Sequence, residues 1–225
     1  MDNMDKMLDN ILKKDDIYVS QFEKENFILE PLLDEIESIK DDPIRQFVRS
    51  LLLNAKEFWE IPSAFSEDQH PPDEYCTGGA VMHTKRMVRV VELLSDSYGL
   101  DELDIDILKA AALIHDITKG VILDKESIPS FDHFYPYTLD HYVRQVQKLD
   151  EAYAAENQSS TVFLLDSVVK KILRLVRCHL GPWSPIPETI PFEEMEMMLH
   201  VAEQISKNIH IIVDGDDIME SRWTM

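Results

Sequence analysis

The sequence has little glycine, few cysteines and a deficit of basic residues. Six glycines among 225 residues, with almost no alternation of polar and apolar residues, argue against a β-sheet fold. Two cysteines, Cys76 and Cys178, cannot build a disulfide scaffold, and we interpret both as small buried or half-buried thiols. The 22 Lys and Arg against 43 Asp and Glu give a net charge of −21, which argues against tight binding of long nucleic acids.

Long hydrophobic runs are absent as well. No apolar run reaches the roughly 18 residues that a membrane span needs. The first residues, from Met1 to Asp5, are too acidic for a signal peptide. We therefore expect a cytoplasmic protein without a membrane partner. The hydrophobic share of 44% nevertheless supports a packed core and excludes wholesale disorder.

The pattern that is present is helical nearly throughout. Between residues 44 and 59 apolar residues recur every three or four positions, and Asp41-Asp42-Pro43 before them is typical of a helix start. A connection rich in proline and glycine covers residues 61–79. We therefore predict an N-terminal helical extension, residues 1–70, and a second domain, residues 71–225. Helices are expected at about residues 30–40, 44–59, 80–98, 104–118, 138–155, 162–178 and 192–208, with a loop at 121–137.

The apolar stripe of the N-terminal helices has two interpretations. It packs against the core of the second domain, or it faces another copy of the chain and makes a homo-oligomer.

The placement of the histidines indicates chemistry. His83 lies on the apolar side of its helix, and His115 and Asp116 stand together after the apolar run that ends at Ile114. Alone, each histidine could be a core residue with a satisfied hydrogen bond. Because a buried carboxylate needs a partner or a metal, the His-Asp pair is costly in a core. Together with later histidines and an acidic residue on a late helix, these residues form a set of nitrogen and oxygen ligands. Such ligands suit Mn, Fe, Co, Ni or Zn, or Mg where carboxylates dominate.

Three stretches carry a resemblance to a known family. They are Thr77-Gly78-Gly79-Ala80-Val81-Met82-His83-Thr84, Ala112-Leu113-Ile114-His115-Asp116-Ile117-Thr118-Lys119-Gly120 and His200-Val201-Ala202-Glu203-Gln204-Ile205-Ser206. Over about residues 76–210 the chain resembles the HD-domain metal-dependent phosphohydrolases. It is most similar to the branch that includes bacterial 3′-to-5′ exonucleases, in which a Gly-Gly pair also precedes the first histidine. The resemblance implies an all-α fold, an HD-domain helical bundle with additional N-terminal helices.

The resemblance also implies a ligand set for one or two divalent metal ions. His83, His115 and Asp116 would bind the first ion. The last ligand of the family is usually Asp, and Glu203 stands at that place here. His141 and His179 match the additional histidines of two-metal members. The paired histidines of some members are Cys178-His179 in this chain.

Candidate substrate-binding residues lie around this set. Lys119 follows Asp116 by about one turn, so it is expected to neutralise phosphate charge; the alternative is a lysine that favours the negative end of its helix. Asp116 is expected to orient the attacking water as well as bind metal. Weaker candidates for contact with substrate are Arg86, His133, Arg144, Arg177 and Trp183.

Two functions follow from these residues. The first is a metal-dependent phosphohydrolase or phosphodiesterase in which a metal-activated water attacks a nucleotide or a short nucleic-acid end. The substrate class rests on the resemblance, and the net charge favours the smaller substrate. The second is a nucleotide-binding or regulatory HD module with weak or no catalysis, because Glu203 and Cys178 depart from the full ligand pattern.

Overall fold

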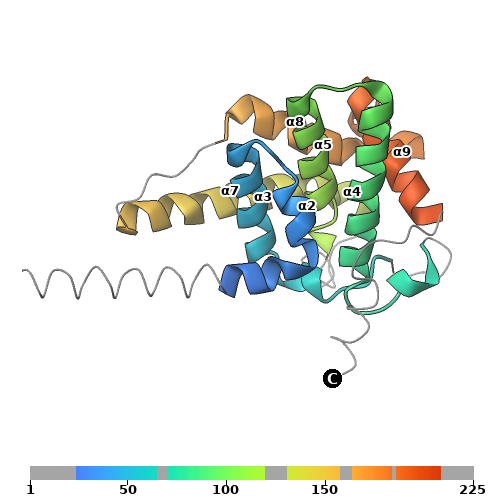
Figure 1. The fold of residues 1–225 in the computed structure, drawn as a ribbon. Helices are drawn as coiled ribbons and strands as arrows, with labels where there is room; N and C mark the ends of the chain where they lie inside the picture. The colour runs from blue at the N-terminus through green and yellow to red at the C-terminus, as the bar shows by residue number, and fades with distance from the viewer. Residues whose placement is uncertain (1–23, 65–69, 120–130, 158–163, 184–185, 209–225) are drawn as a thin grey trace, which may run out of the picture.

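The computed structural model describes residues 24–64, 70–119, 131–157, 164–183 and 186–208 (Figure 1). Within these ranges all regular structure is helical and no strand forms, which confirms the all-α prediction. The longer helices are α3 (Asp42–Asn54), α4 (Gly79–Tyr98), α5 (Glu102–Ile114), α7 (Phe131–Asn157), α8 (Asp166–Cys178) and α9 (Glu194–Asn208). The short elements are η1 (Glu30–Leu32), α2 (Leu33–Glu37), η2 (Lys56–Trp59), η3 (Pro72–Glu74), η4 (Gly181–Trp183) and η5 (Pro187–Thr189).

Helices α4 and α5 lie side by side at the centre of the molecule (Figure 1). Helix α9 packs against α4, α8 packs against α5, and α2 and α3 cover another side of α5. Helix α5 is almost entirely buried from Ile107 to Ile114, because its small alanines let its neighbours approach closely. The end of α5 is therefore held inside the bundle, and the His-Asp pair follows immediately.

The N-terminal helices share the hydrophobic core of the later helices. Ile44 and Val48 of α3 are fully buried in the same cluster as Leu113 of α5 and Leu199 of α9. The apolar stripe of α3 thus packs inside this chain, and homo-oligomerisation through the N-terminal helices stays a prediction. The division at residue 70 stays a prediction, and the core runs across it without a break.

The predicted starts and ends of helices have clear physical causes. The side chain of Asp41 accepts a hydrogen bond of 2.9 Å from the Ile44 amide, and Asp101 caps α5 in the same way through the Asp104 amide at 2.8 Å. Gly99 ends α4 in the left-handed conformation, with φ of 65°.

Three boundaries differ from the predictions. The helix expected over residues 44–59 ends at Asn54, and η2 continues it as a tighter turn. Helix α5 ends at Ile114, so the following residues form a turn instead of a last helical turn. Helix α7 begins at Phe131, inside the predicted loop, and runs through Pro136. A proline usually ends a helix, and this rule misplaced the start of α7.

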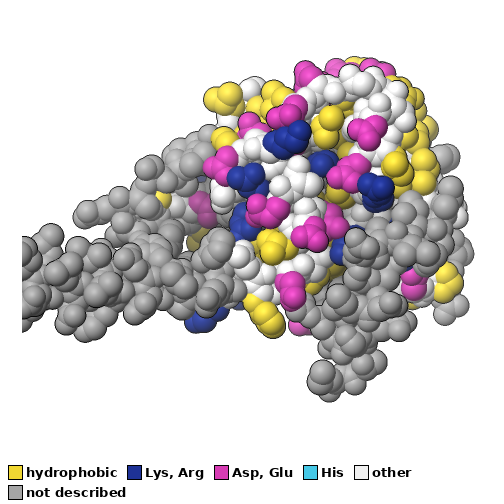
Figure 2. Space-filling model, in the orientation of Figure 1, with side chains coloured by type: hydrophobic (Ala, Val, Ile, Leu, Met, Phe, Trp, Pro, Cys, Tyr) yellow, Lys and Arg dark blue, Asp and Glu magenta, His cyan; other side chains and the backbone are white. Residues whose placement is uncertain are grey.

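Lys and Arg side chains are interspersed with the acidic ones on the face drawn in Figure 2. Lys109 and Glu92 form one ion pair of the described structure, at 2.9 Å. Among the described residues, no helix combines the length and apolar character that crossing a membrane requires.

Candidate metal centre

Buried imidazoles and carboxylates from distant parts of the chain meet where α4, α9 and the ends of α5 and α8 come together. Each is at most 3% exposed: His83, His115, Asp116, His179 and Glu203. All five were predicted as metal ligands from the sequence. Helical periodicity directs His83 and Glu203 toward the bundle interior, whereas the other three follow the ends of α5 and α8. The packing of α4 with α5 and α9 brings them into one place.

The first contact joins α4 to α9. Nε2 of His83 lies 2.9 Å from Oε2 of Glu203. Burial alone would lower the pKa of His83, but the Glu203 and Glu74 carboxylates outweigh burial and raise it to about 9. Burial would raise the pKa of Glu203, whereas Lys207, His83 and His115 together hold it well below its usual range. Glu203 is therefore a carboxylate anion in a fully buried place.

His115 is held with one nitrogen directed into the site. Its Nδ1 lies 2.7 Å from the carbonyl oxygen of Ala112. A carbonyl can only accept, so Nδ1 donates to it, and Nε2 is the nitrogen left to face the site. That Nε2 lies 3.3 Å from Oδ2 of Asp116 and 3.7 Å from Oε2 of Glu203. The turn after α5 therefore presents a ligand nitrogen next to two carboxylates.

His179 repeats this arrangement at the end of α8. Its Nδ1 donates to the carbonyl oxygen of Val176, 2.5 Å away, which leaves Nε2 with a lone pair. Burial is the main reason that the pKa of His179 is lowered, to about 4, so this ring is neutral near pH 7. The centroids of the His115 and His179 rings are 5.4 Å apart. The backbone of α8 thus holds a second imidazole beside that of His115.

The donor set fits a divalent metal ion. Nε2 of His115 and Oδ1 of Asp116 are buried, and neither has a hydrogen-bond partner among the residues that the structure describes. Buried polar atoms are normally satisfied, so two neighbouring unsatisfied ones call for a missing partner. Ligand atoms of His83, His115 and Glu203 all lie within 4.8 Å of one another. Nitrogen and carboxylate oxygen suit Mn, Fe, Co, Ni or Zn.

Two lysines flank the two carboxylates of the site. Lys119 Nζ contacts Oδ2 of Asp116 and donates to the carbonyl oxygen of Ser63 at 2.9 Å. Lys207 Nζ lies 2.5 Å from Oε1 of Glu203. Burial would raise the pKa of Asp116, but His115 and Lys119 hold it well below its usual range. Sequence reasoning found Lys119 and missed Lys207, although its position four residues after Glu203 on one helix was an available signal.

The sequence profile of the HD domain family matches residues 81–217, a range that contains all of these predicted ligands. The chain belongs to the HD domain family. It is also 26% identical over 192 residues to the dihydroneopterin 2′,3′-cyclic phosphate phosphodiesterase of Methanocaldococcus jannaschii, a match that covers 81% of this chain and 70% of that protein. No solved structure matches the chain.

These comparisons confirm the predicted HD domain and support a metal-dependent phosphohydrolase in general. HD domains bind divalent metals, and His83, His115 and Glu203 form a group that could hold one. The finer similarity, to the exonuclease branch, stays a prediction from the sequence.

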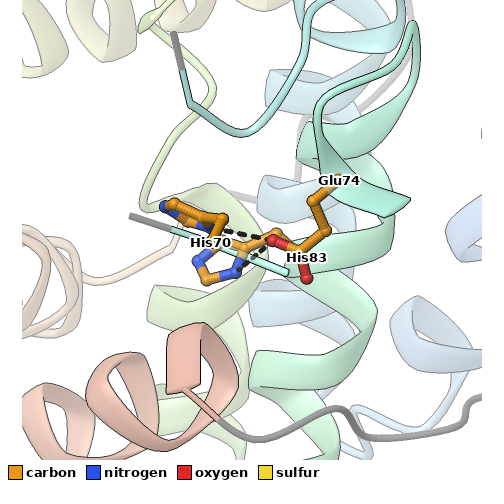
Figure 3. Close-up of side chains that lie close together, drawn as sticks. All are labelled: His70, Glu74 and His83. Carbon is orange, nitrogen blue, oxygen red and sulfur yellow. Dashed lines mark hydrogen bonds and ion pairs between the residues drawn. The ribbon is translucent and has the colours of Figure 1, made fainter. Parts of the chain in front are cut away.

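A further group of side chains adjoins the ligands of this HD domain, and sequence reasoning missed it. Glu74, at the end of η3, is 0% exposed. Its Oε2 lies 2.8 Å from Nδ1 of His70 and 3.3 Å from Nδ1 of His83 (Figure 3). Burial would raise the pKa of Glu74, but the two imidazoles and Arg86 lower it below its usual range. His70, to which the sequence gave no role, is 8% exposed and belongs to this group.

Arg86 has a different place from the one that the sequence suggested. It was a candidate for binding substrate, yet its side chain is fully buried. The guanidinium pairs with Asp73 and donates from Nη1 to Oε1 of Glu74 at 2.6 Å. These bonds hold the guanidinium against Glu74, so Arg86 supports that carboxylate, and its contact with substrate stays a prediction.

The remaining candidates lie outside this cluster or outside the described side chains. Arg177 pairs with Asp140 of α7, and Arg144 of α7 is exposed. The side chains of His141, His133 and Trp183 lie outside the described residues. Their predicted roles therefore stay predictions.

Proposed function

We propose that this HD domain protein is a metal-dependent phosphodiesterase that hydrolyses a phosphate ester of a small nucleotide-like substrate. The observation that carries the proposal is the pair of buried, unsatisfied ligand atoms, Nε2 of His115 and Oδ1 of Asp116. A core without a ligand would satisfy these atoms with a protein partner. In a core that binds metal, these two atoms lack a protein partner because the ion takes that place.

Four residues would hold the first ion: His83, His115, Asp116 and Glu203. His179 would extend the site toward a second ion, together with His141 if its side chain faces the same way. A divalent ion held here would activate a water molecule and polarise the phosphoryl oxygens.

The charges around the site favour a phosphate once a cation is bound. Two carboxylates, Asp116 and Glu203, are balanced by two lysines, Lys119 and Lys207, so their sum is zero. Addition of a divalent cation makes this sum +2. The site thus attracts an anion although the whole chain carries −21. The lysines are 13% and 21% exposed, which leaves their ammonium groups partly accessible from solvent.

The side chains around the site would have separate catalytic roles. Lys119 and Lys207 would donate hydrogen bonds to phosphate oxygens, where negative charge increases in the transition state. Asp116 would accept a hydrogen bond from the attacking water and orient it, because its Oδ1 has no other described partner. Nδ1 of His115 stays bound to the Ala112 carbonyl and keeps the ring orientation fixed.

The size of the substrate is part of the proposal. The Methanocaldococcus jannaschii relative is named for a 2′,3′-cyclic phosphate of a pterin. A small cyclic phosphodiester also agrees with the net charge, which disfavours long polyanions. The short nucleic-acid end that the exonuclease branch suggests remains the other substrate to test.

The test uses the full chain with Mn²⁺ and a substrate panel. The panel contains 2′,3′-cyclic AMP, dihydroneopterin 2′,3′-cyclic phosphate, 3′,5′-cyclic AMP, 5′-AMP and a short oligonucleotide. We expect ring opening of a 2′,3′-cyclic phosphate to a monoester without release of inorganic phosphate. Asp116→Asn should abolish hydrolysis. The matched control is Asp150→Asn, since Asp150 bonds Ser50 outside the site. Metal binding without hydrolysis of any substrate would favour the binding-module alternative.

A further inference from the structure

Glu74 connects one of the proposed metal ligands to a buried cation. It stands in η3, a short turn in the proline-rich connection before α4, and its carboxylate is completely buried. Its two oxygens face different partners. Oε1 accepts from Arg86 at 2.6 Å, and Oε2 faces the Nδ1 atoms of His70 and His83 (Figure 3). A buried carboxylate persists only with such compensation.

We infer that Glu74 is a positioning residue of the metal centre. Arg86 anchors the Glu74 carboxylate, and this carboxylate fixes the orientation and tautomer of the His83 ring. The inference rests on the proposed function, because it takes His83 as a metal ligand. A carboxylate on the Nδ1 side draws the ring proton to that nitrogen. The opposite nitrogen, Nε2, then offers its lone pair to an ion.

Both nitrogens of His83 face carboxylates, so Nε2 donates to Glu203 here, and an ion bound at Nε2 would replace that proton and leave the other on Nδ1. Nδ1 lies 3.3 Å from Glu74, on one side of the ring, and Nε2 lies 2.9 Å from Glu203, on the other. The imidazole therefore spans from a supporting carboxylate to the ligand cluster. Oε2 of Glu74 is shared with His70, whose 2.8 Å contact is the closer one. Glu74 thus supports two rings at once, and the ring planes of His70 and His83 meet at 75°.

The backbone holds Glu74 against α4. The second glycine before His83, Gly79, has no space for a side chain, since a Cβ there would collide with the Glu74 carbonyl oxygen. The same carbonyl accepts from the Ser63 amide at 3.0 Å. Arg86, one turn after His83 on α4, donates a hydrogen bond to the Glu74 carboxylate. Helix α4 therefore carries both His83, the proposed ligand, and Arg86, which anchors Glu74.

Another interpretation is a separate metal site, since His70, Glu74 and His83 also place ligand atoms within 4.8 Å of one another. Two observations disfavour it. The guanidinium of Arg86 is bonded to the same carboxylate and would repel a second cation. His83 would also have to bind one ion through each nitrogen, which requires loss of both ring protons.

The experiment measures Mn²⁺ affinity and ion count in the chelator-treated full chain, and the visible absorption of the Co²⁺-loaded protein. For Glu74→Gln we expect an affinity about 10- to 100-fold weaker, an unchanged number of ions and a shifted Co²⁺ absorption. The matched control is Glu196→Gln, because Glu196 is also buried and paired with an arginine, Arg174, but contacts no imidazole in the described structure. It should bind Mn²⁺ like the wild type.

Two more variants keep the outcome decisive if Glu74→Gln does not fold. Arg86→Lys keeps the charge but loses the forked contact, so it should weaken Mn²⁺ binding in the same direction and by less. His70→Ala should keep the number of ions. Loss of one ion in His70→Ala would overturn the inference in favour of a separate metal site.

Wild-type affinity in Glu74→Gln would overturn the inference while the proposed function stands. Absence of metal from the wild type would overturn the proposed function itself.

Discussion

Oε2 of Glu203 reaches Nε2 of His83 at 2.9 Å, across 120 residues of sequence. The resemblance to HD domains makes Asp the usual last ligand, so the extra methylene of a glutamate raised the question of whether the carboxylate still reaches the site. In this structure the carboxylate of Glu203 does reach the site. The same oxygen is 3.7 Å from Nε2 of His115. The carboxylate thus faces both histidines that would bind the first ion.

Glu203→Gln tests whether this carboxylate binds the ion. We expect Mn²⁺ affinity to fall by at least about 100-fold, because even changes one layer beyond the ligands cost about 10- to 100-fold. Isothermal titration of chelator-treated protein measures the effect. Glu194→Gln, an exposed glutamate on the same helix, is the control and should leave the affinity unchanged. Equal affinities in the two variants would remove Glu203 from the ligand set.

Metal binding should stabilise the fold, since the ion binds only where the helices bring its ligands together. At a metal concentration of 100 times Kd the gain is about 2.7 kcal/mol. For a chain of this size this raises Tm by about 5–10 °C. A chelator should reverse the shift in a thermal melt. Asp116→Asn should show little shift, whereas Asp150→Asn should keep it; a full shift in Asp116→Asn would contradict the assignment.

The part of the site that could be predicted is the part carried by helices. His83 and Glu203 lie on the inner faces of amphipathic helices, and the His-Asp pair ends an apolar one, so periodicity indicates that they point inward. Glu74 and His70 were missed because they stand in a connection rich in proline, where no periodicity shows which side chains are buried. Only the packing of that connection against α4 reveals them.

Substitution of Lys119 should change catalytic activity and metal affinity in different ways. Lys119→Gln should lower kcat/KM by about 100-fold, the usual cost of one lost donor to a developing charge. Mn²⁺ affinity should stay the same or rise, because Lys119 contacts Asp116 and competes with a cation for it. Lys109→Gln is the control, since Lys109 pairs with Glu92. A fall in metal affinity together with activity would give Lys119 a structural role instead.

The two cysteines should differ sharply in reactivity. Cys178, just before His179, is 0% exposed, and burial, with Glu196 nearby, raises its pKa to about 12. At pH 8 its thiolate fraction is therefore about 10⁻⁴. Cys76 is exposed. A thiol reagent should modify Cys76 within minutes in the native protein and reach Cys178 only after unfolding, and Cys76→Ser should abolish the fast phase. A second fast-reacting thiol in the native protein would contradict the burial of Cys178.

Gly181 tests how the loop after α8 holds His179. The residue has φ of 73°, and a Cβ there would run into the ring of His200. That ring donates from Nδ1 to the carbonyl oxygen of His179 at 2.9 Å, so its displacement would disturb the backbone that carries a proposed ligand.

The matched control is Gly99→Ala. Gly99 has a similar φ of 65° but no atom within 4 Å of its would-be Cβ. Gly99→Ala should cost only the left-handed strain, about 1–2 kcal/mol. Gly181→Ala should cost about 1–3 kcal/mol more, because it adds a clash in a packed place. Urea unfolding measures both free energies. Equal losses would mean that His200 moves aside without cost, and its ring would then have no part in positioning His179.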